Sequence, residues 1–234
     1  MQPQLSESKS VIKDKSSYHH GDLRMALIYA VAQKIAQKRS LDFQLRDIGP
    51  MVGTSVPAIY RHFASKQDLL VATAIHGYEL QKQFRDYALE KTDFSPVHQI
   101  LGIGFAYVHF SRDFPGFFTL MKNLETELIL SSEVYQKQRH ITMLSVRTLV
   151  VDGLSEGLIA PLELELILGS LQAIAYGVAQ LYLVNTMEHV APVRHNDPKF
   201  ASELLIQGVR GLLTPKGKAI LAQNCKNPFH NGIY

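Results

Sequence analysis

Cysteine and long apolar runs are the scarcest features of this 234-residue chain. Its single cysteine, Cys225, excludes an internal disulfide and any cysteine-rich zinc module. No uninterrupted apolar run reaches the length that spans a bilayer, and the N-terminus lacks the basic-then-apolar pattern of a secretion signal. We therefore expect a cytoplasmic protein with no membrane partner.

Residue groupings that carry catalysis or bind metals are also missing. No Ser/His/Asp set, glycine-rich phosphate loop or pair of carboxylates stands in a context that supports a reaction. The histidines do not fall at metal-ligand spacing: His19 and His20 are adjacent near the N-terminus, and His189 and His195 flank a proline-containing loop. The sequence thus predicts no catalytic residue, no metal site and no cofactor, and it argues against an enzyme.

Charge is modest and unevenly distributed. Hydrophobic residues make up 46% of the chain and charged residues 19%, which is ordinary for a soluble globular protein. Residues 1–70 hold ten Lys/Arg against six Asp/Glu, whereas residues 71–234 hold fourteen against fifteen. The whole positive excess therefore lies in the first part of the chain, as expected of a surface that binds phosphates.

The spacing of apolar residues predicts an all-α fold with about nine helices, because no β-rich segment or internal repeat is present. Residues 1–17 predict a disordered tail, although their lysines could also lie along DNA as a basic arm. The other predicted parts are a helix-turn-helix head at 18–65, a C-terminal helical domain at 66–214 whose first helix (66–91) connects it to the head, and a tail at 215–234. Further helices are expected at 23–38, 97–112, 128–151, 162–187 and 199–213.

The stretch 45–66, L-R-D-I-G-P-M-V-G-T-S-V-P-A-I-Y-R-H-F-A-S-K, predicts two short helices joined by a tight turn. Gly53 suits the left-handed backbone of the turn, Ser55 suits the N-cap of the second helix, and Pro57 suits its first turn. The face left exposed on the second helix carries small residues at its tip, then an aromatic hydroxyl and cations. Such a surface suits a DNA groove and its phosphates.

From Leu23 to Leu70 the chain resembles the DNA-binding head of TetR-family transcriptional regulators. The resemblance lies in L-R-D-I-G, G-T-S-V-P-A-I-Y-R-H-F and S-K-Q-D-L-L, and in the order of the helices. It implies a dimeric regulator, most often a repressor, that binds a palindromic operator in double-stranded DNA. It also implies a C-terminal helical bundle that dimerises and holds a small-molecule effector, whose binding releases the DNA.

The resemblance places Tyr60 and Lys66 at phosphates and the tip of the second helix at base edges. From the residues alone, Tyr60 could instead be a core aromatic and Lys66 a solvated lysine. The chain departs from the family at Pro50, which we expect to bend the first short helix, and at Thr54 in the turn. The predicted DNA-contacting residues are Gln44, Arg46, Thr54, Ser55, Val56, Pro57, Ala58, Tyr60, Arg61, His62 and Lys66.

The C-terminal half more loosely resembles one TetR C-terminal subgroup, in A-Y-V-H-F-S-R-D-F-P-G-F-F-T-L-M and A-I-A-Y-G-V-A-Q-L-Y-L. Where that subgroup carries Trp and His, this chain has Gln172 and Tyr176. We expect a pocket for a small apolar or aromatic effector, with plain core as the alternative. Polar members of the set need a partner if buried, which a ligand, a neighbouring side chain or a second chain could supply. The predicted pocket residues are Phe105, His109, Phe117, Phe118, Met121, Met143, Arg147, Gln172, Tyr176 and Gln180.

The helix expected at 162–187 is apolar nearly all round, so it must be buried on more than one side. In a domain of this size, that predicts a homodimer through this helix and the one at 199–213, with Gly169 and Gly177 allowing a partner helix to approach closely. Two other functions stay open: a DNA-binding architectural or interaction protein without an effector, and a small-molecule binder that has lost operator recognition. The sequence does not give the operator, the effector, the regulated genes, or repression versus activation.

Overall fold

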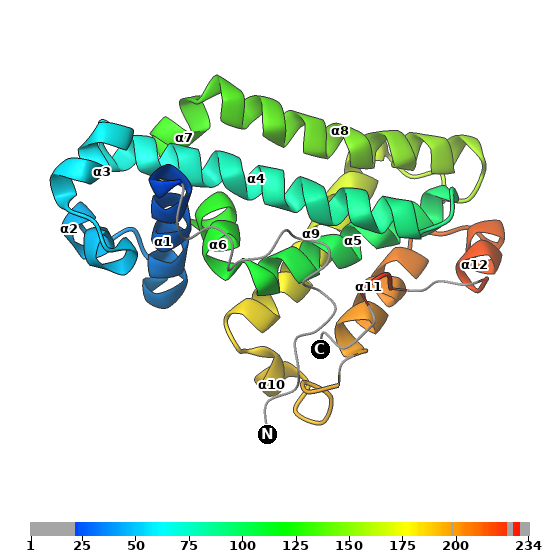
Figure 1. Cartoon of the computed structure of the whole chain (residues 1–234). Coiled ribbons are helices and arrows are strands. Elements are labelled where there is room, and N and C mark those ends of the chain that lie inside the picture. The colour runs from blue at the N-terminus through cyan, green and yellow to red at the C-terminus, as the bar shows by residue number, and fades with distance from the viewer. Residues whose placement is uncertain (1–21, 198, 224–226, 230–234) are drawn as a thin grey trace. The chain divides into compact units, whose positions relative to one another are not determined.

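A computed structural model describes residues 22–197, 199–223 and 227–229, and these form twelve α-helices and one 3-10 helix (Figure 1). The predicted tail at 1–17 lies outside the described residues. Within them, the all-α prediction is confirmed: no strand occurs beyond a single bridge between Ile159 and Leu213. The elements are α1 (Leu23–Lys38), α2 (Leu45–Ile48), η2 (Gly49–Val52), α3 (Val56–His62), α4 (Lys66–Lys91), α5 (Pro96–Asp113), α6 (Pro115–Asn123), α7 (Glu127–Ser131), α8 (Glu133–Ser155), α9 (Leu164–Leu183), α10 (Met187–Val190), α11 (Phe200–Arg210) and α12 (Pro215–Leu221).

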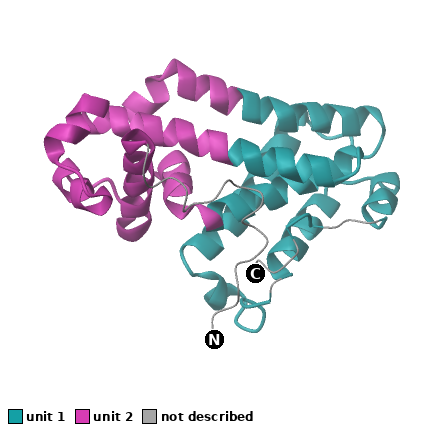
Figure 2. Cartoon of the chain, in the orientation of Figure 1, with its two compact units in different colours: residues 1–11, 81–112, 141–234 teal, residues 12–80, 113–140 magenta. Residues whose placement is uncertain are grey.

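The described residues form two compact units (Figure 2). Unit 2 holds the residues up to Leu80 together with Asp113–His140, and unit 1 holds Gln81–Arg112 and the chain from Ile141 onward. Both α4 and α8 contribute residues to each unit. The functional boundary expected between residues 65 and 66 stays a prediction.

Unit 2 is built on α1, whose first turn is capped by the Asp22 carboxylate accepting from the Met25 N–H at 3.3 Å. Its inner face buries apolar side chains such as Leu27, Val31 and Ile35 completely. The start of α6 packs directly on α1: a Cβ at Gly116 would lie only 1.8 Å from the carbonyl oxygen of Ala32. Glycine is thus required where these two helices meet.

Polar groups are buried among the aromatic side chains of unit 2. The rings of Tyr78 and Tyr135 meet edge to face at 5.1 Å, and the Tyr135 hydroxyl donates to the Met121 carbonyl at 3.3 Å and to Glu125. The Lys122 ammonium donates to the Tyr78 hydroxyl at 3.3 Å. Burial raises the pKa of Tyr78 to about 12 and lowers the pKa of Lys122 to about 8.

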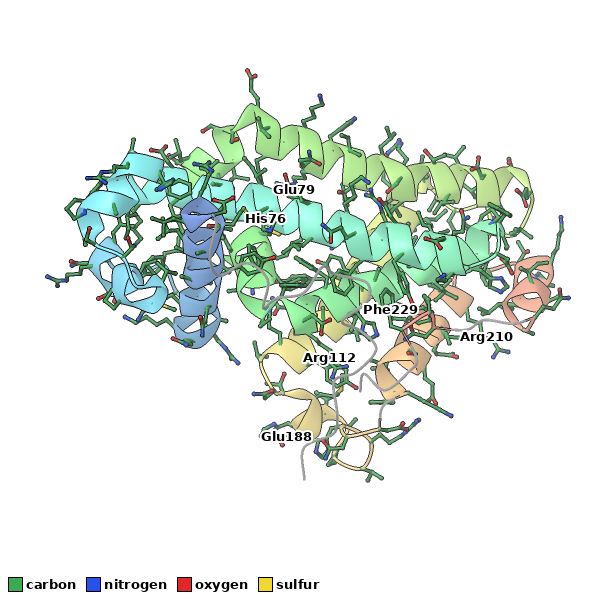
Figure 3. The ribbon with its side chains drawn as sticks, in the orientation of Figure 1. His76, Glu79, Arg112, Glu188, Arg210 and Phe229 are labelled. Carbon is green, nitrogen blue, oxygen red and sulfur yellow. The ribbon has the colours of Figure 1, made fainter. Side chains whose placement is uncertain are left out.

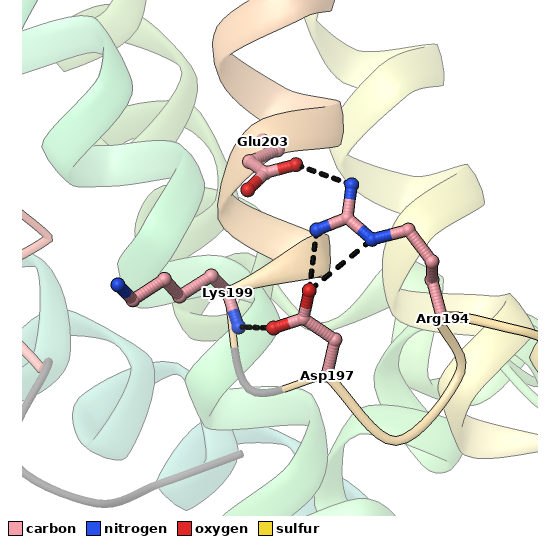
Figure 4. A network of polar contacts seen from close by, with 4 residues as sticks. All are labelled: Arg194, Asp197, Lys199 and Glu203. Carbon is pink, nitrogen blue, oxygen red and sulfur yellow. Dashed lines mark hydrogen bonds and ion pairs between the residues drawn. The ribbon is translucent and has the colours of Figure 1, made fainter.

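In unit 1, α5 is central and α11 packs against α9, where a Cβ at Gly208 would lie 2.8 Å from the Ile174 side chain. The loop before α11 is fixed by Arg194, which pairs with Asp197 and Glu203 (Figure 4). Asp197 also accepts from the Lys199 N–H at 2.9 Å. These hydrogen bonds raise the pKa of Arg194 and lower the pKa of both carboxyl groups.

The prediction of a tail at 215–234 is wrong for residues 215–221, which form α12. Pro215 begins that helix instead of ending the previous one, as proline's fixed φ allows. Thr214 caps it by accepting from the Gly217 N–H at 3.1 Å, and its hydroxyl donates to the Gly157 carbonyl at 2.7 Å. This contact lies 57 residues back along the chain, so local periodicity carries no sign of it.

Two predicted helices end differently in the structure. The helix expected at 128–151 is interrupted by Ser132, whose backbone is extended, so that α7 and α8 are separate, and α8 then continues through Gly153. The helix expected at 162–187 ends at Leu183, close to Asn185 in the left-handed region at φ +57°. Short helices account for the count above nine, because four to seven residues show little periodicity.

Candidate DNA-binding surface and effector pocket

The turn between the two short helices is tightly closed. Gly53 has φ +68°, and the Thr54 N–H donates to the Gly49 carbonyl at 2.9 Å. A Cβ at Gly49 would lie 2.7 Å from the carbonyl oxygen of Thr54. Pro50 has no N–H to continue α2, so the chain tightens into the 3-10 helix η2, which is the form the expected bend takes.

Helix α3 is anchored on one side and open on the other. The Ser55 hydroxyl accepts from the Ala58 N–H at 3.4 Å, as expected of an N-cap. Ile59 is fully buried, whereas the side chain of Tyr60 is 54% exposed and Arg61 is exposed beside it. Tyr60 is therefore a surface residue and not a core aromatic.

Arg24 supports the end of α3, a role the sequence did not indicate. Its guanidinium donates to the His62 carbonyl at 3.0 Å and lies 4.3 Å from the centre of the Phe63 ring. A cation at a helix C-terminus is electrostatically favourable. Arg24 lies 38 residues before His62, so only the tertiary structure brings them together.

Lys66 is held inside the head. Its Nζ donates to the carbonyls of Leu41 at 2.5 Å and Phe43 at 2.6 Å, and lies 4.2 Å from the centre of the Phe43 ring. Desolvation lowers its pKa. The alternative of a solvated lysine is wrong, and a phosphate contact from this residue would have to use its remaining N–H.

The other predicted DNA-contacting residues all lie in unit 2, on α2, the turn or α3. Gln44, Arg46, Ser55, Pro57 and His62 are exposed. Half-buried positions are occupied by Thr54, Val56 and Ala58. Next to Arg46, the Asp47 carboxylate accepts from the Gln44 N–H at 2.8 Å. This hydrogen bond holds the pKa of Asp47 below its usual value. The surface therefore presents exposed cations with its nearest carboxylate engaged in capping α2.

Comparison with known families agrees with the geometry of the head. Residues 28–73 match the model of bacterial regulatory proteins of the tetR family. The head therefore resembles the DNA-binding domain of that family. The matched range covers α2, η2, α3, most of α1 and the beginning of α4.

Solved structures show that the TetR fold extends over the rest of the chain. A protein of unknown function from Rhodococcus sp. RHA1 is 23% identical, with 86% of this chain and all of that chain covered at a TM-score of 0.66. A TetR regulator from Marinobacter aquaeolei VT8 is 17% identical (81% and 95% covered, TM-score 0.62). The ketosteroid transcriptional regulator KstR2 of Mycobacterium tuberculosis is 16% identical (83% and 96% covered, TM-score 0.63). No curated protein matches the chain.

The residues predicted to line an effector pocket are divided between the two units. In unit 2, Phe117, Phe118 and Met121 are buried core residues of α6. A Cβ at Gly77 would lie 2.3 Å from the Met121 sulfur, so this region is tightly packed. Phe117 alone of the predicted set borders a cleft of about 430 Å³ in unit 2, formed with α1 and η2.

In unit 1 the predicted polar residues have protein partners. The Gln172 side chain donates to the Tyr107 hydroxyl at 3.3 Å, and the Gln180 side chain donates to the Tyr176 hydroxyl at 2.6 Å. Neighbouring hydroxyls thus accept from both amides, one of the alternatives the sequence left open. Phe105 and His109 are buried in α5.

Met143 and Arg147 do not line a pocket in this chain. Met143 is exposed on α8, and the Arg147 guanidinium pairs with the Glu165 carboxylate of α9 at 2.9 Å. The helical spacing of apolar residues in α8 did not distinguish its inner face from its outer face. For these two residues the prediction is wrong.

Helices α8 and α9 leave apolar surface open. On α8, Ile141, Leu144 and Val151 are exposed at three- and seven-residue spacing. Helix α9 is long and apolar enough to cross a membrane by length and composition, although Glu165, Gln172 and Gln180 interrupt its apolar residues, as the sequence predicted. Only 17% of its most apolar stretch is buried within the chain. One such helix is weak support for a membrane span, and its first turn carries Glu165.

The glycines of α9 face open space, whereas several apolar residues of α11 are buried. Nothing lies within 4 Å of a Cβ built at Gly169 or Gly177. By contrast, Ala201, Leu205 and Val209 of α11 are buried within the chain. Apolar side chains that are exposed therefore lie on α8 and α9, whereas on α11 Leu204 and Ile206 are half-buried. Among the residues the structure describes, no three His, Cys, Asp or Glu side chains gather as a metal site would require.

Proposed function

We propose that this protein is a dimeric repressor that acts in the cytoplasm, binds a palindromic operator through α3 and is released by a small apolar or aromatic effector. The observation that carries the proposal is the exposed face of α3, which presents Tyr60, Arg61 and His62 while Ile59 anchors the helix below. In helix-turn-helix proteins the second helix lies in the major groove, and side chains around it contact the DNA phosphates and so fix the orientation of the protein.

We infer that the homodimer uses the open apolar surface of α8 and α9. Open apolar residues on these two helices, with two glycines that face empty space, suit the packing of the same two helices from a second copy. The part expected for residues 199–213 stays a prediction, because Leu204 and Ile206 of α11 are only half-buried. A two-fold dimer places two copies of α3 about one helical turn of DNA apart, or a multiple of it.

A second function, a DNA-binding architectural protein without an effector, is favoured by one observation. Most of the residues expected to line the effector pocket are buried among other side chains or exposed on the surface, as a protein with no effector would have them. The difference between the two functions lies in whether unit 1 can open a site for a small molecule.

Selection of bound sequences from random DNA duplexes tests the proposed operator. We expect an enriched palindrome and a steep loss of affinity as salt rises, because each phosphate contact releases a counterion. Recovery of DNA without any enriched sequence favours the architectural protein. No DNA binding at low salt would leave only a small-molecule binder and would contradict the proposal.

A further inference from the structure

Phe229, labelled in Figure 3, is buried inside unit 1. Three aromatic side chains lie around its ring. Its ring stacks on His109 of α5 at a centroid distance of 4.4 Å and an interplanar angle of 23°. The ring of Phe84 lies 5.9 Å away and that of Tyr87 5.3 Å away, both on α4. These three side chains form what we call the ring cage.

Residues 227–229 belong to no helix. Asn227 holds them: its side-chain Nδ2 donates to the Ser202 hydroxyl at 2.9 Å, and its side-chain oxygen accepts from the Phe229 N–H at 3.0 Å. Withdrawal of the Phe229 ring would therefore break side-chain contacts and no helical hydrogen bond of residues 227–229. Since the predicted pocket residue His109 forms one wall of the cage, Phe229 occupies a position where we expected an effector.

We propose that the ring cage is the effector site and that Phe229 is its resident occupant, which an aromatic effector displaces; this inference rests on the proposed function. The effector is an uncharged molecule with one aromatic ring, because the cage stacks on a ring and burial of a charge there would be unfavourable. Phe84 and Tyr87 lie on the same continuous helix, α4, whose first residue Lys66 holds the Leu41 and Phe43 carbonyls of the head. A molecule in the cage thus contacts the helix that carries the head.

The sequence offers a clean reporter of displacement, because the chain contains no tryptophan. A Phe229→Trp variant keeps an aromatic ring in the cage and gives a single indole, which is excited at a wavelength where the ten tyrosines do not absorb. Toluene, which does not absorb where tryptophan is excited, serves as the probe. We expect toluene to shift the emission to longer wavelength and to saturate, as the introduced indole moves into water. Unshifted emission at saturating toluene overturns the inference.

Phe43→Trp is the matched control, because Phe43 is also buried but lies in unit 2 beneath the Lys66 ammonium. Its emission should not respond to toluene. An equal shift in both variants means that toluene loosens the whole protein, which would also overturn the inference. Circular dichroism establishes that both variants are folded before toluene is added.

Removing the occupant should make the cage easier to enter. If the ring of Phe229 is inside the cage 90 to 99% of the time, Phe229→Ala raises the apparent affinity for toluene by roughly 10- to 100-fold. Phe94→Ala, which truncates a side chain that is 95% exposed, should leave the affinity unchanged. Equal affinity of Phe229→Ala and wild type overturns the inference; should Phe229→Ala fail to fold, the tryptophan reporter still decides.

A DNA measurement separates this inference from the proposed function. On a selected operator, toluene that shifts the emission of Phe229→Trp and also releases DNA supports both. A shift without release supports the cage and overturns effector-controlled release. Release without a shift supports effector control and overturns the cage as its site.

Discussion

The Nζ of Lys66 lies 2.5 Å from the carbonyl oxygen of Leu41, and this hydrogen bond ties the first residue of α4 to the segment before α2. A second bond, to the Phe43 carbonyl, strengthens the same connection. Lys66 therefore stabilises the arrangement of the helix-turn-helix from within. We therefore expect Lys66 to affect DNA binding by stabilising the folded head.

Lys66→Met tests that role. Loss of two hydrogen bonds from a charged donor should destabilise the protein by about 2–4 kcal/mol in urea denaturation. Affinity for operator DNA should fall together with stability, whereas the dependence of affinity on salt should change little. A variant as stable as wild type, with a salt slope reduced by about one, would instead identify Lys66 as a phosphate contact.

Gly53→Ala tests the turn. A Cβ at this position meets nothing within 4 Å, so the expected cost comes only from the left-handed backbone at φ +68°. We expect the free energy of unfolding to fall by about 1 kcal/mol. Gly157→Ala is the matched control, since Gly157 has φ +67° and is equally open but lies outside the head. Both should lose similar stability, and only Gly53→Ala should weaken DNA binding.

Leu144→Glu and Leu166→Glu test the dimer on α8 and α9. Each places a charge on an apolar side chain that is exposed in the single chain. We expect monomers in sedimentation experiments, helical content unchanged, and weaker operator binding because two linked heads bind better than one. Val193→Glu, at a side chain that is 95% exposed, should remain dimeric. Dimers of undiminished strength in both test variants would exclude this interface.

Lys122 gives a pH dependence whose sign is fixed by its burial. Its pKa falls from 10.5 to about 8 in the folded protein, so between these values the unfolded chain binds more protons. Stability contributed by this group should rise as the pH increases from about 8 to 10, by at most about 1.4 kcal/mol per pH unit. Urea midpoints at pH 7 and 9.5 measure this, and Lys122→Met should reduce the rise to the part contributed by Lys66, whose pKa is also lowered. An undiminished rise in Lys122→Met would contradict the assignment to Lys122.

The head could be predicted closely because its signals are local. Gly53 and Ser55 each act on backbone groups within three residues, and the Asp22 cap likewise acts within the first turn of α1. The resulting helix boundaries of α1 and α4 agree with the expected ranges. Local backbone chemistry, read without tertiary context, is sufficient for this part.

The proposed effector site was less predictable because it depends on distant contacts. Phe229 meets His109 across 120 residues of chain, and nothing in the spacing around either residue indicates the pairing. Periodicity shows that one face of α8 is apolar. It does not distinguish burial in the same chain from contact with a second chain, so it did not indicate that Met143 is exposed. The sequence therefore indicated which residues are apolar, and only the tertiary structure assigned them to core, cage or open surface.

Arg61→Ala on a selected operator tests the central claim most directly, because Arg61 is an exposed cation on α3 that does not hold the fold together. Its matched control is Arg210→Ala, at an exposed arginine of α11 in unit 1. If α3 reads DNA, Arg61→Ala weakens binding by roughly 5- to 100-fold, equivalent to about 1–3 kcal/mol, while Arg210→Ala binds as wild type does. Equal affinity of the two variants would contradict the assignment of α3 as the DNA-reading helix.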